Sequence, residues 1–188
     1  MKCAIIGGSV LIRKLSSAEY QDINKLASYL VEKKIHVYTG GCDGFPYVVG
    51  KKCIEYGGTV LGFSPAISES EHVNIYHHPL DGCSKFVFMD SSSNNVNLAF
   101  LLRSLPLIEE ADVVLALEGN WGTLFEVVTA VISGKKIILW KGFGGVSDDF
   151  EILYNKLSKE CKYEYGEQVC YANDLDEVFD YLSECLRN

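Results

Sequence analysis

The fold is decided by residues 112–140, which read DVVLALEGNWGTLFEVVTAVISGKKIILW. The run 112–117 is short, branched and apolar, which predicts a buried strand, and 136–140 has the same character. Between them, a turn at 119–122 leads into apolar residues at helical spacing, so we expect a helix over 123–133. A strand, a helix and a second strand in this order predict two parallel strands joined by a right-handed crossover.

This alternation recurs along the chain without a linker or a repeat. We expect further strands over 2–7, 35–38, 59–63, 86–89 and 168–172, and further helices over 17–34, 43–56, 96–110, 148–161 and 175–186. Pro106 should kink the helix at 96–110 near Arg103, whereas 64–82 shows no period and is expected to be a loop. We therefore predict an α/β fold with residues 1–188 as a single domain. Its sheet should be doubly wound and mostly parallel, with helices on both faces.

Charge and composition restrict the partners. The chain has 188 residues, with 17 Lys and Arg against 25 Asp and Glu, a formal net charge of −8. It carries no basic cluster that would neutralise a run of phosphates, so we expect no nucleic acid partner and no membrane partner. No segment approaches the roughly 20 apolar residues that span a bilayer. Seven cysteines without a CxxC pair, and a first strand that begins at Lys2 and leaves no room for a leader, favour a cytoplasmic protein.

Three glycine turns are candidates for a ligand site, because ligands of doubly wound sheets bind beyond the carboxyl ends of the strands. They are 7–9 (GGS), 39–44 (TGGCDG) and 119–123 (GNWGT). Glycine lets backbone amides approach a ligand, and a helix N-terminus favours anions. None has the GxGxxG spacing of a dinucleotide site or the GxxxxGK[ST] spacing of a P-loop. The first two turns supply the candidate phosphate-binding residues Gly8, Ser9, Gly40 and Gly41.

The third turn opens a helix that presents Glu126 in its first turn. Its amides and the Thr123 hydroxyl are suited to hold a phosphate. A carboxylate near a phosphate is unfavourable unless it performs acid–base work or binds hydroxyls. The alternative interpretation makes Thr123 the N-cap of the helix and Glu126 its capping-box partner. The candidate phosphate-binding residues of this turn are Gly119, Asn120, Trp121, Gly122 and Thr123.

Four motifs resemble those of the Lonely Guy family, whose members were long mislabelled lysine decarboxylases. The stretch 118–126 (EGNWGTLFE) is similar to the family motif PGGxGTxxE, and Arg103, 23 residues before Glu126, matches the place of the family's arginine. The stretches 38–46 (YTGGCDGFP) and 57–65 (GGTVLGFSP) resemble a GGGxxGLM-like loop and a GG.V.G..P stretch, and 7–9 resembles the first GS turn. The resemblance covers roughly residues 2–141 in the family's order.

The resemblance implies a Rossmann-like fold, a homodimer and phosphoribohydrolase activity, in which a nucleoside 5′-monophosphate is hydrolysed to free base and ribose 5-phosphate. Residues 119–123 would bind the 5′-phosphate. Glu126 would bind ribose hydroxyls, stabilise the oxocarbenium-like transition state or activate the water. Arg103 would anchor phosphate or ribose and orient Glu126. Arg103 and Glu126 are therefore the expected catalytic residues, and neither a cofactor nor a metal is expected.

The chain departs from the family motifs at five positions. Glu118 replaces the proline of the motif and adds negative charge beside the expected phosphate, and Asn120 replaces its second glycine. Phe125 replaces a common acidic residue, Leu102 a glutamate before the arginine, and Pro46 a methionine. These departures bring the chain nearer to divergent relatives that bind nucleotides or the molybdenum cofactor. A non-catalytic binding, carrier or sensor protein is therefore the alternative, and a purely structural domain is the third possibility.

Histidine and cysteine residues also occur outside the motifs that carry the resemblance. The segment 72–83 carries His72, His77, His78 and Cys83, whose spacing fits no zinc pattern. We expect a solvated loop rim there, which could also cover the site and contact the base. Cys42 starts a helix without a histidine close in sequence, which favours a bystander over a nucleophile. The polar run 90–97 is expected to line the pocket.

Overall fold

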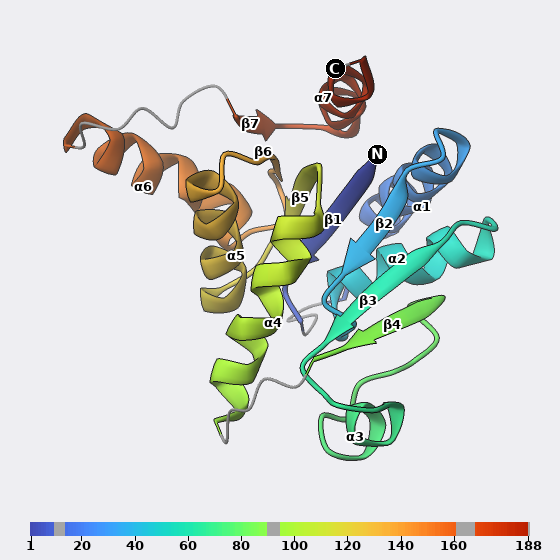
Figure 1. Ribbon diagram of the computed structural model, residues 1–188. Coiled ribbons are helices and arrows are strands. Elements are labelled where there is room, and N and C mark those ends of the chain that lie inside the picture. Colours follow the sequence, from blue (N-terminus) through green and yellow to red (C-terminus); the bar gives the residue numbers. More distant parts are fainter. Residues whose placement is uncertain (10–13, 90–94, 161–167, 188) are drawn as a thin grey trace.

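Seven strands form one sheet, in which every described pair of neighbours is parallel (Figure 1). The computed structural model describes residues 1–9, 14–89, 95–160 and 168–187. The strands are β1 (Lys2–Gly7), β2 (His36–Thr39), β3 (Val60–Ser64), β4 (Lys85–Phe88), β5 (Val113–Leu117), β6 (Lys136–Trp140) and β7 (Val169–Ala172). Their order is β4-β3-β2-β1-β5-β6-β7, so the direction of winding reverses between β1 and β5. The predicted doubly wound α/β sheet is confirmed.

Helices cover both faces of this sheet (Figure 1). On one face lie α1 (Ser17–Glu32), α2 (Phe45–Glu55) and α7 (Leu175–Arg187). On the other lie α4 (Val96–Glu110), α5 (Trp121–Ile132) and α6 (Val146–Glu160). The short helix α3 (Glu69–Asn74) follows β3 at the carboxyl end of the sheet.

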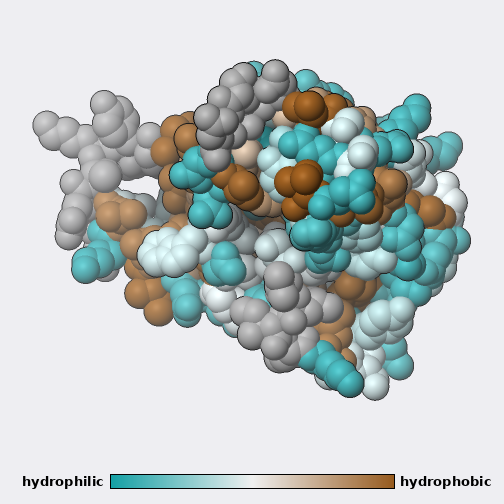
Figure 2. Space-filling model, turned by 90° about the horizontal axis from the view of Figure 1, so that it is seen from below, coloured by the Kyte–Doolittle hydropathy of each residue, from teal (hydrophilic) through white to brown (hydrophobic). Residues whose placement is uncertain are grey.

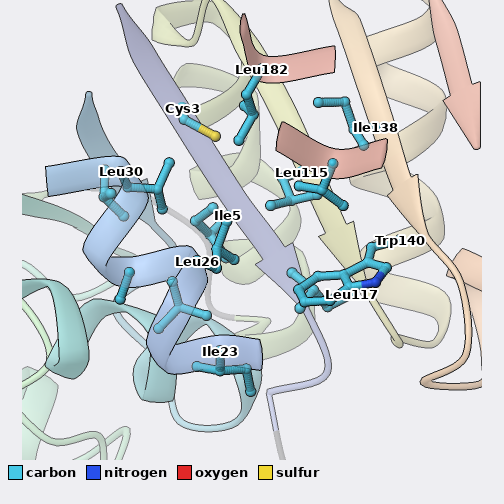
Figure 3. Packing of buried hydrophobic residues seen from close by; sticks show 14 of the residues in the cluster. Cys3, Ile5, Ile23, Leu26, Leu30, Leu115, Leu117, Ile138, Trp140 and Leu182 are labelled. Atoms are coloured by element: carbon cyan, nitrogen blue, oxygen red, sulfur yellow. The ribbon is translucent and has the colours of Figure 1, made fainter. Parts of the chain in front are cut away.

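Alternation along the central strand supplies the core on each face. Cys3 and Ile5 of β1 belong to the cluster under α1, α2 and α7, whereas Ala4 and Ile6 belong to the cluster under α4, α5 and α6. Figure 3 shows Ile5 among apolar side chains of α1 and β5. A strand buried on both faces is a continuous apolar run, and this is why 2–7 and 112–117 are recognisable as strands.

The structure adds the helix α3 to the predicted elements, and three predicted helices begin two residues from their expected start: α2 at Phe45, α5 at Trp121 and α6 at Val146. α3 lies inside 64–82, which was predicted to be a loop; Ser68 caps it by accepting a hydrogen bond from the Glu71 amide at 3.3 Å, but six residues are too few to show a period. α5 begins at Trp121 instead of Thr123, because Asn120 is the cap residue. α4 runs from Val96 to Glu110 as predicted, with Pro106 inside it. Residues 90–94 of the predicted polar run lie outside the described residues.

Burial of α1 predicts the effect of shortening one of its side chains. Ile23 is fully buried, whereas Ile152, also in the interior of a helix, is 74% exposed. We expect Ile23→Ala to lower the free energy of unfolding by about 2–5 kcal/mol, because it removes packed methyl groups and leaves a cavity. The matched change Ile152→Ala should cost under about 0.5 kcal/mol. Urea unfolding measures both, and equal losses would contradict the packing of α1.

Candidate functional site

A cavity of about 260 Å³ opens at the carboxyl end of the sheet, next to the reversal between β1 and β5. Figure 2 views this end of the molecule from below, where hydrophilic residues lie between hydrophobic patches. The walls come from the turns after β1 and β2, the segment after α3, the first half of α4 and the start of α5. The lining residues are Gly7, Ser9, Cys42, His78, Asn97, Phe100, Leu101, Arg103, Ser104, Asn120, Gly122, Thr123 and Glu126. The position agrees with the rule that ligands bind at the switch point of such sheets.

Arg103 of α4 and Glu126 of α5 form a buried ion pair in the wall of this cavity. Arg103 Nη1 lies 3.7 Å from Glu126 Oε1, and the side chains are 7% and 9% exposed. Ser104 donates a hydrogen bond to the same carboxylate oxygen at 2.7 Å. Two adjacent residues of one helix thus hold the carboxylate of the other, and the structure brings the two expected catalytic residues together.

The surroundings of Glu126 favour its protonated form more than water does. Burial raises the pKa of this carboxyl above its ordinary value of 4.5, while the Arg103 charge and the Ser104 hydrogen bond act in the opposite direction. A carboxylate with a raised pKa inside a cavity is typical of a group that handles protons or positive charge in a reaction.

The Arg103 guanidinium fills a space that glycine leaves open. A Cβ atom at Gly40 would collide with Arg103 Nη1, so the turn after β2 needs glycine at this place. Arg103 Nη2 donates to Cys42 Sγ at 3.5 Å, and the guanidinium lies 5.8 Å from the centre of the Phe100 ring. Arg103 Nε has no hydrogen-bond partner among the described residues. A buried donor without a partner is rare in folded proteins, so Arg103 Nε sets this cavity wall apart from an ordinary packed core.

The turn before α5 has a backbone that only a small residue permits. Gly119 has φ +102°, and a Cβ atom there would overlap the Thr123 side chain. Two hydrogen bonds to the start of α6 stabilise the turn. Ser147 Oγ accepts from the Glu118 amide at 2.9 Å, and the Gly119 carbonyl accepts from the Val146 amide at 3.0 Å. The first amides of a helix have no acceptor within it, so the start of α5 offers donors to the cavity.

The capping-box interpretation of this turn is wrong. Asn120 is the cap residue of α5, and Thr123 lies inside the helix. The Glu126 carboxylate contacts Ser104 and Arg103 of α4 instead of the amide of the cap residue. The Glu126 side chain therefore connects α5 to α4, whereas a capping box would bind it to the backbone of α5 itself.

Not all of the expected phosphate-binding residues line the cavity. Ser9, Asn120, Gly122 and Thr123 do, and Gly40 lines a small adjoining cavity that it shares with Arg103 and Glu126. Four others are not among the residues that line these two cavities: Gly8, Gly41, Gly119 and Trp121.

These four residues have structural surroundings of their own. The Gly8 carbonyl accepts from the Phe45 amide, the Gly41 amide donates to Thr39 Oγ1 at 3.2 Å, and Gly119 supports the turn. Trp121 is 84% exposed and borders a separate groove beside α6. Helix geometry explains the last case, because adjacent residues at a helix start point about 100° apart.

Several lining residues were missed by reasoning from the sequence. Ser104 follows Arg103 directly, but its role depends on the packing of α4 against α5. His78 lies in the segment that was expected to be a solvated rim, and this expectation is wrong at the first residue of the segment, because His72 is fully buried. The density of histidines at 72–78 was the available signal, but it fitted no zinc pattern and favoured a solvated rim that could also cover the site. Among the described residues, no group of three or more His, Cys, Asp or Glu is placed to hold a metal ion.

Solved structures share this architecture over nearly the whole chain. A protein named TM1055 is 25% identical, with TM-score 0.73 over 97% of this chain and 98% of its own. The molybdenum cofactor carrier protein of Chlamydomonas reinhardtii is 19% identical, with TM-score 0.68 over 100% and 99%. DNA processing protein A of Helicobacter pylori is 16% identical, with TM-score 0.66 over 98% of this chain and 80% of its own. No curated protein matches.

The expectation that excludes nucleic acid as a partner is wrong. DNA processing protein A of Helicobacter pylori has the same fold, and its structure is described as showing a single-stranded DNA binding mode. The physical reason is that net charge averages over the whole surface, whereas binding depends on the local arrangement of charge. In the described part of the chain, no helix is both long and apolar enough to cross a membrane.

Family membership agrees with the resemblance of the motifs. A sequence model of the SLOG cluster4 family matches residues 1–179, which is nearly the full chain. The match includes the turns at 7–9, 39–44 and 119–123 as well as Arg103 and Glu126. The chain belongs to the SLOG cluster4 family.

Proposed function

We propose that this protein hydrolyses the N-glycosidic bond of a nucleoside 5′-monophosphate and releases free base and ribose 5-phosphate. The observation that carries the proposal is the buried pair of Arg103 and Glu126, which borders a cavity beside the open start of α5. The reaction needs a site for a phosphate and a carboxylate for the developing positive charge on the ribose, and the cavity offers both.

The phosphate belongs at the start of α5. Asn120, Gly122 and Thr123 line the cavity there, and Ser9 faces it from the turn after β1. Amides at the start of a helix donate to an anion, and the helix dipole adds to the attraction. The chain carries a net charge of −8, so this attraction must be local. Arg103 Nε is one more buried donor without a partner among the described residues.

Glu126 acts on the ribose. Cleavage of the glycosidic bond builds positive charge on the sugar ring, and a carboxylate near that charge stabilises the transition state by several kcal/mol. The same carboxylate accepts a proton from the attacking water. Arg103 favours the ionised carboxylate in a buried setting, and Ser104 fixes the orientation of Oε1.

A non-hydrolysing carrier or sensor of a phosphorylated ligand is the second candidate. The Glu118 side chain is buried directly before the expected phosphate site, where added negative charge would weaken the binding of a reactive dianion. The full-length fold similarity to a molybdenum cofactor carrier protein gives this candidate a ligand class, although at 19% identity it concerns the fold alone. In this candidate Arg103 and Glu126 bind the ligand without hydrolysis.

Product analysis tests the proposal. We expect free base from at least one of the 5′-monophosphates of adenosine, guanosine, cytidine and uridine. The matching nucleosides should give none, because they lack the phosphate that binds at the start of α5. Glu126→Gln should lower turnover by about 100- to 1,000-fold while a monophosphate still raises the melting temperature. The exposed control Glu109→Gln should keep wild-type turnover. Thermal stabilisation by a monophosphate without any free base would instead favour the carrier.

The same substitution predicts a pH-dependent gain in stability. Burial raises the pKa of Glu126 in the folded protein above 4.5, so the folded state holds a proton that the unfolded chain has released. The free energy of unfolding therefore falls as pH rises through this window. Glutamine has no such dependence, so the free energy of unfolding of Glu126→Gln relative to the wild type should be higher at pH 8 than at pH 5. Urea unfolding at both pH values measures the gain, and a gain that shrinks at pH 8 would show that Arg103 dominates burial.

A further inference from the structure

His78 lines the cavity, and the Asp43 carboxylate holds its ring at Nδ1. Nδ1 lies 3.1 Å from Asp43 Oδ2, an arrangement in which the imidazole donates and the carboxylate accepts. The His78 side chain is 13% exposed and lines the cavity. Its Nε2 is buried and makes no hydrogen bond to any described residue within the usual limits of distance and angle, although the Cys42 thiol lies close enough to act on the ring. A histidine that lines a cavity and is oriented by a carboxylate is suited to proton transfer.

The groups around His78 favour its protonated form. Burial lowers the pKa of His78, but the neighbouring Cys42 thiol and Asp43 carboxylate together outweigh burial and raise the pKa above 6.5. His72, whose ring centre lies 5.6 Å away, has a pKa lowered chiefly by burial. It is therefore neutral at pH 7 and does not repel a charge on His78. Arg103 is the other cation that lines this cavity in the described residues.

Phe100 connects His78 with the pair of Arg103 and Glu126. The His78 ring meets the Phe100 ring edge-on at 5.7 Å, and the Arg103 guanidinium lies 5.8 Å from the centre of the same ring. An aromatic face in a cavity stacks a nucleobase, because every base has a π face. A base stacked on Phe100 would lie beside His78, and Arg103, which contacts the same ring, lies 3.7 Å from Glu126.

We propose that His78 is the general acid that protonates the leaving base, with Asp43 as its positioning residue. This inference rests on the proposed function. The glycosidic bond between C1′ and the base nitrogen breaks, and its electron pair passes to the base. The imidazolium Nε2 gives its proton to a ring nitrogen of the base. Water forms the new bond to C1′ and gives its proton to Glu126, and exchange with solvent restores both residues.

A substrate whose base needs no proton separates this role from a structural one. The base of 7-methylguanosine 5′-monophosphate is already cationic and leaves as a neutral molecule. His78→Gln should lower turnover about 100-fold or more on the natural monophosphate that the wild type cleaves fastest, but less than about 10-fold on the 7-methyl compound. His36→Gln, the same change at an exposed site at the amino end of β2, should leave both unchanged.

The outcomes distinguish the two proposals. Equal losses on both substrates, or no loss on either, would overturn the role of His78 while leaving the hydrolase intact. Absence of free base from every substrate, the 7-methyl compound included, would overturn the hydrolase and the acid together. Melting curves of each variant establish that it is folded.

The pH dependence of turnover tests the same assignment with a second variant, Asp43→Asn. With Glu126 as base and His78 as acid, kcat should fall on the acid side as Glu126 gains a proton and on the alkaline side as His78 loses one. Asp43→Asn removes a charge that raises the pKa of His78, so the alkaline limb should move to lower pH. The Asp43 side chain is 47% exposed, so this variant should fold. An alkaline limb unchanged in Asp43→Asn and in His78→Gln would contradict the assignment.

Discussion

The ion pair between Arg103 and Glu126 ties together the elements that build the cavity. It joins α4 to α5 at 3.7 Å, and the same guanidinium reaches Cys42 in the turn after β2. Burying two charges costs much hydration free energy, and their attraction offsets this cost only when the geometry is good and further hydrogen bonds are made. Ser104 and Cys42 supply those bonds, and Gly40 supplies the room. The turn after β2 and two helices are thereby placed relative to one another at the reversal of the sheet.

Stability alone does not explain such a pair. Replacing a buried ion pair by packed apolar residues is often neutral or stabilising, so the pair is weak evidence for a role in stability. The two nitrogen atoms without partners, Arg103 Nε and His78 Nε2, belong to residues that line the same cavity. Their neighbours Glu126 and Cys42 are acceptors already engaged by the guanidinium. Both nitrogens are buried beside the cavity, and no described residue accepts a hydrogen bond from them.

The parallel sheet was predictable because strands buried on both faces are continuous apolar runs that end at glycine turns. Arg103 and Glu126 were predictable as a pair because a motif carries each of them at a fixed distance. The positions of individual turn residues relative to the cavity could not be predicted in this way. Trp121 and Gly122 are neighbours in sequence, yet one is exposed beside α6 and the other lines the cavity. Such differences depend on where α5 begins, and a shift of two residues turns each side chain by about 200°.

His78 shows why spatial proximity is harder to predict than composition. It lies 35 residues after Asp43, and their contact requires that β2 and β3 pair in register and that the chain return through α3. A six-residue helix gives no periodic signal, so this return was invisible in the sequence. Net charge misleads for a related reason. The chain carries −8 in total, but the cavity is lined by Arg103, by His78 with its raised pKa and by the amides of α5. Because fields inside a cleft are set by the nearest groups, an acidic protein binds an anion wherever its few buried donors converge.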